Sequence, residues 1–179
     1  MNRYLASLAL LLFIVPSLRA EGGQPLATLS VEGRSPLTLA SQATRQDLFG
    51  AVDLYTVALY TDGGMVSRES LASADAAKAL RIEVNYNEDF RRKIALDWRR
   101  ELIPRLEPAA AAHIQGSFAP IQHGDTIVVE YVPARGTTVR VNKGVAVSGA
   151  NHDLMLAFLD LWMGQRPLSE EIKQALLGR

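Results

Sequence analysis

The sequence has no cysteine, so its fold does not depend on disulfide bonds. It also has no excess of charge, because 19 basic side chains balance 19 acidic ones among 179 residues. A chain without a basic surplus lacks the surface that a nucleic-acid binder needs, and we therefore exclude that class. One domain of this length buries roughly two-thirds of the surface of its unfolded chain, which is enough to hold a fold without cross-links or a structural metal.

Several local catalytic motifs are missing as well. The sequence contains no Gly-x-Ser-x-Gly elbow, no Walker A loop, no Gly-x-Gly-x-x-Gly and no His-Glu-x-x-His. The three histidines, His113, His123 and His152, fall in separate predicted elements without the spacing of metal ligands. We therefore expect neither a metal nor a cofactor, and we interpret the histidines as surface or capping residues.

The first twenty residues are typical of a secretory signal peptide. Arg3 forms a short positive head, residues 4–18 carry no charge, and the small Ala20 precedes the polar Glu21. The alternative, a retained membrane anchor, is disfavoured because the apolar run is short for a transmembrane helix. We expect cleavage after Ala20, no stable membrane insertion afterwards, and a periplasmic or secreted domain over residues 21–179.

No repeat, low-complexity tract or charged tail divides residues 21–179, which indicates a single domain. Short β-prone stretches at 26–31 and 37–44 flank a turn cluster and predict a hairpin. Residues 48–61 predict a long strand with a bulge or bend at Gly50. An Ala-rich stretch over 67–80 predicts a helix, and the alternating residues 81–86 predict the strand that follows it.

The second half of the sequence alternates helices with a meander of strands. Phe90, Ile94, Trp98 and Leu102 recur every four residues and predict a helix that ends near Pro104. Further expected elements are a helix over 108–115, strands over 126–132, 137–141 and 145–148, and two helices capped by Asn151 and Ser169. Strands on both sides of a helical block predict an α+β fold, with an antiparallel sheet and helices on one face.

Arg45 and Tyr55 are the candidate ligand-binding residues. In one straight strand they would lie about 33 Å apart and could not share a ligand. A chain reversal near Gly50 would instead bring them face to face on two strands, where both could hold one carboxylate or enolate oxygen. The alternative remains that Arg45 faces solvent or pairs with Asp47 or Asp53, and that Tyr55 belongs to the core.

Four segments, in order, resemble the chalcone isomerase-like family of bacterial proteins. Residues 43–45 followed by 54–60 resemble its Arg-then-VYxxALY region, and residues 90–97 resemble its helix. Residues 124–149 resemble its Gly-Asp, Tyr-x-Pro and Asn-x-Gly meander, and residues 161–178 resemble its WLG…LLG ending. The resemblance implies a chalcone isomerase-like open-faced β-sandwich, in which a large antiparallel sheet packs against a layer of helices around a ligand cleft.

The resemblance also implies what each site residue does. In the plant isomerases a strand Arg stabilises the phenolate, assisted by a strand Thr and by a helix Tyr and Asn seven residues apart. This sequence keeps the Arg as Arg45, whereas Tyr55 falls at the Thr, Phe90 and Asp97 fall at the helix pair, and Leu161 fills a polar position of the late helix. Phe cannot donate a hydrogen bond, and an Asp repels developing negative charge, so we predict no catalytic residues.

The Arg plus Tyr pairing resembles the non-catalytic fatty-acid-binding members of the family. The resemblance therefore implies that Arg45 and Tyr55 hold a carboxylate, in a pocket lined by Phe90, Ile94, Asp97 and Leu161. We expect a non-catalytic binder of a fatty acid or a similar small apolar carboxylate. The alternatives are an intramolecular lyase or isomerase acting on a chalcone-like substrate, and a partner-binding protein with an empty cleft; the oligomeric state stays open.

Overall fold

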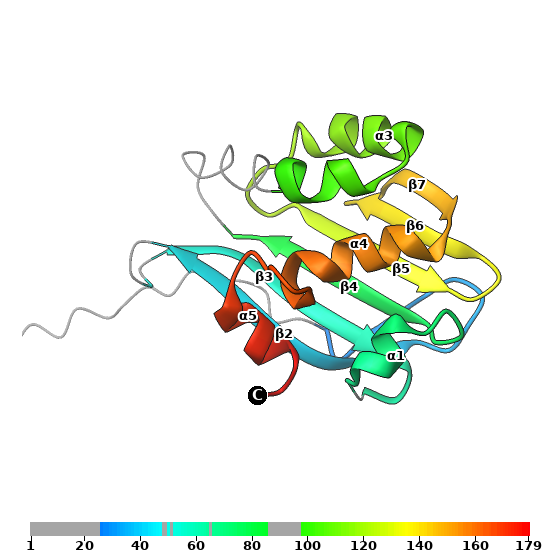
Figure 1. The fold of residues 1–179 in the computed structure, drawn as a ribbon, viewed down its shortest axis with the longest axis horizontal. Coiled ribbons are helices and arrows are strands. Elements are labelled where there is room, and N and C mark those ends of the chain that lie inside the picture. Colours follow the sequence, from blue (N-terminus) through cyan, green and yellow to red (C-terminus); the bar gives the residue numbers. More distant parts are fainter. Residues whose placement is uncertain (1–25, 48–49, 51, 65, 86–97) are drawn as a thin grey trace, which may run out of the picture.

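A computed structural model describes residues 26–47, 50, 52–64, 66–85 and 98–179. Within these residues seven strands form one antiparallel sheet, in which every strand pairs with its neighbours in the sequence (Figure 1). The strands are β1 (Thr28–Leu29), β2 (Leu37–Asp47), β3 (Val52–Thr61), β4 (Lys78–Val84), β5 (Thr126–Val132), β6 (Gly136–Val141) and β7 (Gly144–Ala150). The predicted meander is confirmed.

Helices α4 and α5 lie across one face of this sheet (Figure 1). The helices are α1 (Arg68–Ala72), α3 (Pro108–Phe118), α4 (His152–Met163) and α5 (Glu170–Leu176), with 3-10 turns η1 (Asp62–Gly64) and η3 (Ile103–Arg105) and a helical stretch at 98–102. The side chains of Asn151 and Ser169 accept hydrogen bonds from the backbone N–H groups of the first turns of α4 and α5. These two caps are placed as predicted, and they explain where both helices begin.

The main hydrophobic core lies between the sheet and the helices. Its fully buried members include Val57, Leu80 and Ile127 of the central strands. Phe158 and Trp162 of α4 are fully buried in it as well. Each large apolar side chain buried in this way contributes about 1.5 to 3 kcal/mol to stability. The helix layer is therefore held mainly by the inward face of α4.

The opposite face of the sheet is more polar. A small second cluster, which includes Leu37 and Tyr60, covers it at the β1 end. Elsewhere ion pairs occupy this face, with the Arg81 guanidinium 2.9 Å from the Glu83 carboxylate. The sheet thus has one face covered by helices and one largely polar face. This is the predicted open-faced arrangement.

The helix predicted over residues 67–80 is wrong for most of its length. Only Arg68–Ala72 is helical, capped by the Ser67 side chain, and strand β4 already begins at Lys78. The Ala-rich composition favours a helix locally, but residues 78–84 form the strand between β3 and β5 and hydrogen-bond on both sides. Tertiary pairing therefore overrides helix propensity here.

The predicted strand over 48–61 is shorter than expected. Strand β2 runs on to Asp47, β3 starts at Val52, and the two strands are antiparallel, so the chain reverses between them. Gly50 lies within this reversal at a φ of +86°, a conformation that glycine adopts without steric cost. Gly50 is a turn residue and not a bend inside one strand.

The helix predicted from Phe90 lies partly outside the described residues. In its described part, Trp98 and Leu102 are buried as their four-residue spacing predicts, and the helix passes into the 3-10 turn that contains Pro104. Helix α3 extends to Phe118 and is three residues longer than the stretch 108–115 that we predicted.

Candidate functional site

Arg45 on β2 and Tyr55 on β3 are direct partners across the two strands. Directly opposite residues of antiparallel strands project from the same face of a sheet. That face is the one covered by helices, because Ala43, two residues before Arg45, and Tyr55 itself both belong to the main core. The reversal at Gly50 thus places Arg45 and Tyr55 opposite each other on two strands, and not far apart on one straight strand.

A β-bulge adjoins this pair. The register shifts between Arg45, which faces Tyr55, and Gln46, which faces Asp53, so that Leu54 is an extra residue on β3. Leu54 and Tyr55 are consecutive in the chain, yet both are buried in the same core. A bulge re-aims side chains in this way and is over-represented near functional sites.

The hydroxyl group of Tyr55 is held by a tryptophan from α4. Trp162 donates a hydrogen bond from Nε1 to the Tyr55 Oη atom at 3.1 Å, in a buried environment. The ring of Tyr55 also makes edge contacts with Trp98 and Trp162, with centroids 6.1 and 6.2 Å apart. Tyr55 is only 4% exposed, so it is both a core residue and a fixed polar group.

The Arg45 side chain is partly buried. Among the described residues it forms no ion pair with Asp47 or Asp53, and the Asp53 carboxylate instead accepts a hydrogen bond from Gln46 Nε2 at 2.7 Å. The expected alternative pairing of Arg45 is thus not seen in this part of the chain. A cationic residue directly opposite a buried tyrosine suits an anionic oxygen ligand.

Of the other four candidate residues, the structure describes one. Leu161 is 1% exposed and lies in the core on α4, whereas Phe90, Ile94 and Asp97 fall outside the described residues. From their spacing, Trp98 and Trp162 are predicted as core residues only. Nothing in their spacing could have shown that the indole N–H of one of them would bond to a tyrosine 107 positions away in sequence.

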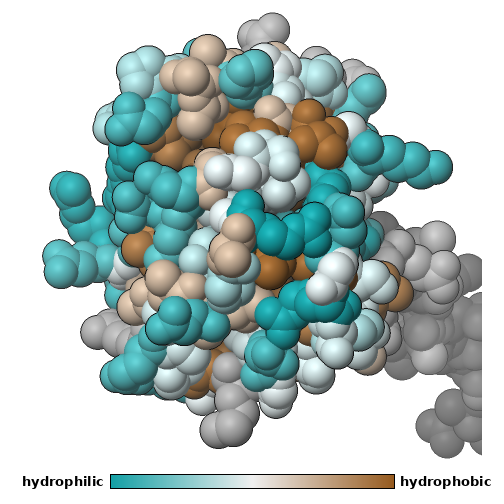
Figure 2. All heavy atoms as spheres, turned by 90° about the vertical axis from the view of Figure 1, so that its right-hand side faces the viewer, coloured by the Kyte–Doolittle hydropathy of each residue, from teal (hydrophilic) through white to brown (hydrophobic). Residues whose placement is uncertain are grey.

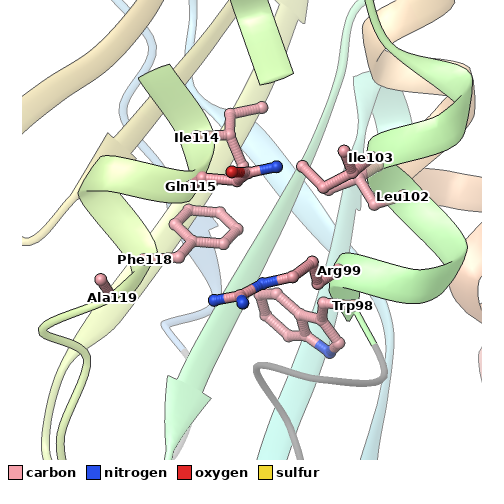
Figure 3. Close-up of a pocket in the computed structure, with 8 residues that line it drawn as sticks. All are labelled: Trp98, Arg99, Leu102, Ile103, Ile114, Gln115, Phe118 and Ala119. Carbon is pink, nitrogen blue, oxygen red and sulfur yellow. The ribbon is translucent and has the colours of Figure 1, made fainter. Parts of the chain in front are cut away.

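A small hollow adjoins Trp98. Its walls are Trp98, Arg99, Leu102 and Ile103 on one side and Ile114, Gln115, Phe118 and Ala119 on the other, and the two sets face each other (Figure 3). The cavity volume is about 20 Å³, which is room for about one water molecule. An acyl chain does not fit into this hollow as it stands.

A larger hollow lies between α4, α1 and Leu177. Its volume is about 270 Å³, and its lining includes Leu71, Leu159 and Met163. Asp160 also lines it, and the carboxylate of Asp160 is paired with the Arg105 guanidinium at 3.0 Å. On the face shown in Figure 2, hydrophobic patches are separated by hydrophilic side chains.

Comparison with known proteins identifies the family. A model of the chalcone isomerase-like family matches residues 19–178. The chain belongs to the chalcone isomerase-like family. A solved structure of a fatty-acid binding protein from Arabidopsis thaliana shares 17% sequence identity with it at a TM-score of 0.56, covering 79% of this chain and 86% of that one. No curated protein sequence matches the chain.

At this level of identity the Arabidopsis structure shows a shared fold. It agrees with the seven-stranded antiparallel sheet and its helices, and thereby confirms the predicted chalcone isomerase-like architecture. Among the described residues of this chalcone isomerase-like protein, no helix is long and apolar enough to span a membrane, and no group of His, Asp and Glu side chains could hold a metal.

The groups with shifted pKa values lie away from Arg45. Burial lowers the pKa of Lys78 to about 8, and Lys78 faces Thr61 at the end of β3 far from Tyr55. Burial and the nearby Lys78 charge lower the pKa of His152, which Asp153 partly opposes. Burial raises the pKa of Tyr60, although Arg81 counteracts this shift.

Proposed function

We propose that this chalcone isomerase-like protein is a non-catalytic binder of a fatty acid or a similar small apolar carboxylate. The observation that carries the proposal is the direct pairing of Arg45 with Tyr55 on the helix-covered face of the sheet. A guanidinium and a phenol in this arrangement hold a carboxylate through charge-assisted and neutral hydrogen bonds. The apolar side chains between the sheet and α4 form the surroundings that a hydrocarbon tail requires.

The fold-level likeness supports this choice, because the similar Arabidopsis protein is named as a fatty-acid binding protein. The energetics support it as well. Each buried CH₂ group is worth about 0.8 kcal/mol, so a tail of about ten contributes on the order of 8 kcal/mol before entropic costs. A hydrogen bond to a charged group contributes about 1.5 to 3 kcal/mol. The tail therefore sets the affinity, and Arg45 sets the orientation.

We expect side chains to move when a ligand binds between the sheet and the helices. Among the described residues, Trp98 contacts Phe118 at a centroid distance of 5.5 Å, and the cavity beside this contact measures about 20 Å³. A tail that enters this side of the core must separate these rings, and both tryptophans of the chain belong to the affected aromatic cluster. We therefore expect tryptophan emission to change when dodecanoate binds.

The direct test is native mass spectrometry of the purified protein, followed by calorimetric titration with dodecanoate. The expected results are a copurifying fatty acid, saturable binding of one dodecanoate per protein molecule, and a negative heat-capacity change from apolar burial. A ligand-free spectrum together with no heat of binding for dodecanoate or hexadecanoate contradicts the proposal.

We also expect no enzyme-like cyclisation of chalcones. The resemblance places Phe90 and Asp97 where the isomerases have their helix donors, and Tyr55 is bound by the indole of Trp162. Incubation with naringenin chalcone, followed optically and by the chirality of the product, measures this. Stereoselective turnover well above the spontaneous rate would instead support the isomerase or lyase alternative.

The proposal includes export to the periplasm or the extracellular space, on the basis of residues 1–20. Removal of this segment by signal peptidase after Ala20 leaves a chain that begins at Glu21. N-terminal sequencing of the exported protein should therefore start at Glu21. A membrane-bound product that still begins at Met1 would show that the segment is a retained anchor.

A further inference from the structure

The indole nitrogen of Trp98 is a buried donor without an acceptor. Trp98 is 3% exposed, and its Nε1 atom has no hydrogen-bond partner among the described residues. A buried N–H group left unpaired costs about 1 to 3 kcal/mol, so native structures rarely contain one without a reason. In Figure 3 this nitrogen lies on the edge of the ring that faces away from Phe118 and Gln115.

Trp98 adjoins the proposed head-group site. Its ring centroid is 6.1 Å from that of Tyr55, which is in turn the direct strand partner of Arg45. The two rings meet edge to face, with an interplanar angle of 80°. The residue with the unpaired donor thus contacts Tyr55, the strand partner of Arg45.

Trp162 holds the Tyr55 hydroxyl group of the same site through a hydrogen bond. By donating its indole N–H to the Tyr55 oxygen, it fixes where that oxygen lies. Arg45 offers only donors, and so does Trp98. A set composed of donors fits a head group that only accepts hydrogen bonds, and among such head groups the positive charge of Arg45 favours the ionised carboxylate.

We propose that Trp98 is a specificity-determining residue of the ligand site, whose Nε1–H donates to a carboxylate oxygen of the bound ligand, and that Trp162 positions Tyr55 for the same purpose. This inference rests on the proposed function. It adds that the site selects ionised carboxylates over alcohols and primary amides of equal chain length, because these head groups bring N–H or O–H donors of their own to a site composed of donors.

The first test is a nuclear magnetic resonance titration of the ¹⁵N-labelled protein. The chain has two tryptophans, so its spectrum contains two indole N–H signals, which Trp98→Phe and Trp162→Phe assign. Saturation with dodecanoate should move the Trp98 indole proton downfield and slow its exchange with water. Dodecanol at the same concentration should leave that signal close to its position in the free protein.

The second test compares affinity with stability in Trp98→Phe, which keeps an aromatic ring but removes the N–H group. We expect dodecanoate affinity to fall about tenfold, and the melting temperature of the free protein to hold or rise, because an unpaired buried donor is gone. Trp162→Phe is the matched control. Its melting temperature should fall, since the hydrogen bond to Tyr55 is lost.

The outcomes separate this inference from the proposed function. If dodecanoate binds the wild type and Trp98→Phe equally and the Trp98 signal does not move, Trp98 is a packing residue and the inference is wrong, although the protein still binds fatty acids. If dodecanoate and dodecanol bind equally well, selection for a carboxylate is wrong. If neither binds the wild type at all, the proposed function and the inference both fail. The wild-type titration decides these points even if a variant does not fold.

Discussion

Replacing Arg45 with alanine should weaken dodecanoate binding about ten- to a hundredfold, which corresponds to about 1.5 to 3 kcal/mol. The loss follows from geometry, because Arg45 is paired with the buried Tyr55 and has no ion-pair partner among the described residues. Removing it leaves a carboxylate in apolar surroundings without a counter-charge. Calorimetric titration of the purified variant measures the change.

Controls separate the charge of Arg45 from its packing. Methyl dodecanoate should bind the wild type more weakly than dodecanoate does, but it should bind Arg45→Ala no worse than it binds the wild type. Arg105→Ala removes a guanidinium that pairs with Asp160 at 3.0 Å on another part of the surface, and it should leave affinity unchanged. Equal dodecanoate affinity in the wild type and Arg45→Ala would show that Arg45 is a surface residue without a role in binding.

The sequence predicted well those elements whose signals are local. Strand β5 begins and ends where its apolar run does, and helices α4 and α5 start at the capping residues Asn151 and Ser169. The turn residues 142–144 predict that β6 and β7 pair as antiparallel neighbours, which the structure confirms. A cap, a turn and an alternating run each depend on a few neighbouring residues, so one sequence is sufficient to find them.

The errors arose where distant contacts decide the structure. Nothing near Lys78 in the sequence indicates that β4 begins there, because that strand is stabilised by its partners β3 and β5. Spacing alone also left open whether Gly50 was a bend or a reversal. Only the pairing of β2 with β3 decides between a separation of about 33 Å and a position of Arg45 directly opposite Tyr55.

The candidate site was predictable only in part for the same reason. The resemblance to the family singled out Arg45 and Tyr55, and the structure then brings them together. The hydrogen bond from Trp162 and the unpaired nitrogen of Trp98 depend on how α4 and the 98–102 segment pack onto the sheet. Such contacts join positions far apart in the sequence, and no local motif records them.

Replacing Lys78 with methionine should lower the free energy of unfolding by about 2 to 4 kcal/mol at pH 7, because buried carbonyl groups lose their donor. Lys78 is 1% exposed, and its Nζ atom donates to the carbonyl oxygens of Leu71 at 2.7 Å and Ser73 at 2.6 Å. These bonds fasten the end of α1 to the sheet. Methionine fills a similar volume without a donor, and chemical denaturation measures the loss.

The same substitution should reveal a dependence on pH. Burial lowers the pKa of Lys78 from 10.5 to about 8 in the folded protein. Between these values the unfolded chain holds a proton that the folded chain has released, so the stability that Lys78 contributes rises with pH. The neutral amine keeps two N–H donors, which suffice for Leu71 and Ser73.

The stability difference between the wild type and Lys78→Met should therefore widen from pH 8 to 10.5. The raised pKa of Tyr60 acts in the other direction at the upper end of this range, because the folded state then holds the extra proton. Tyr60 is present in both proteins, so its contribution cancels in the difference. Denaturation curves at intervals of half a pH unit measure the trend. A constant or shrinking difference would show that Lys78 stays protonated in the folded protein, with its charge stabilised by the carbonyl groups around it.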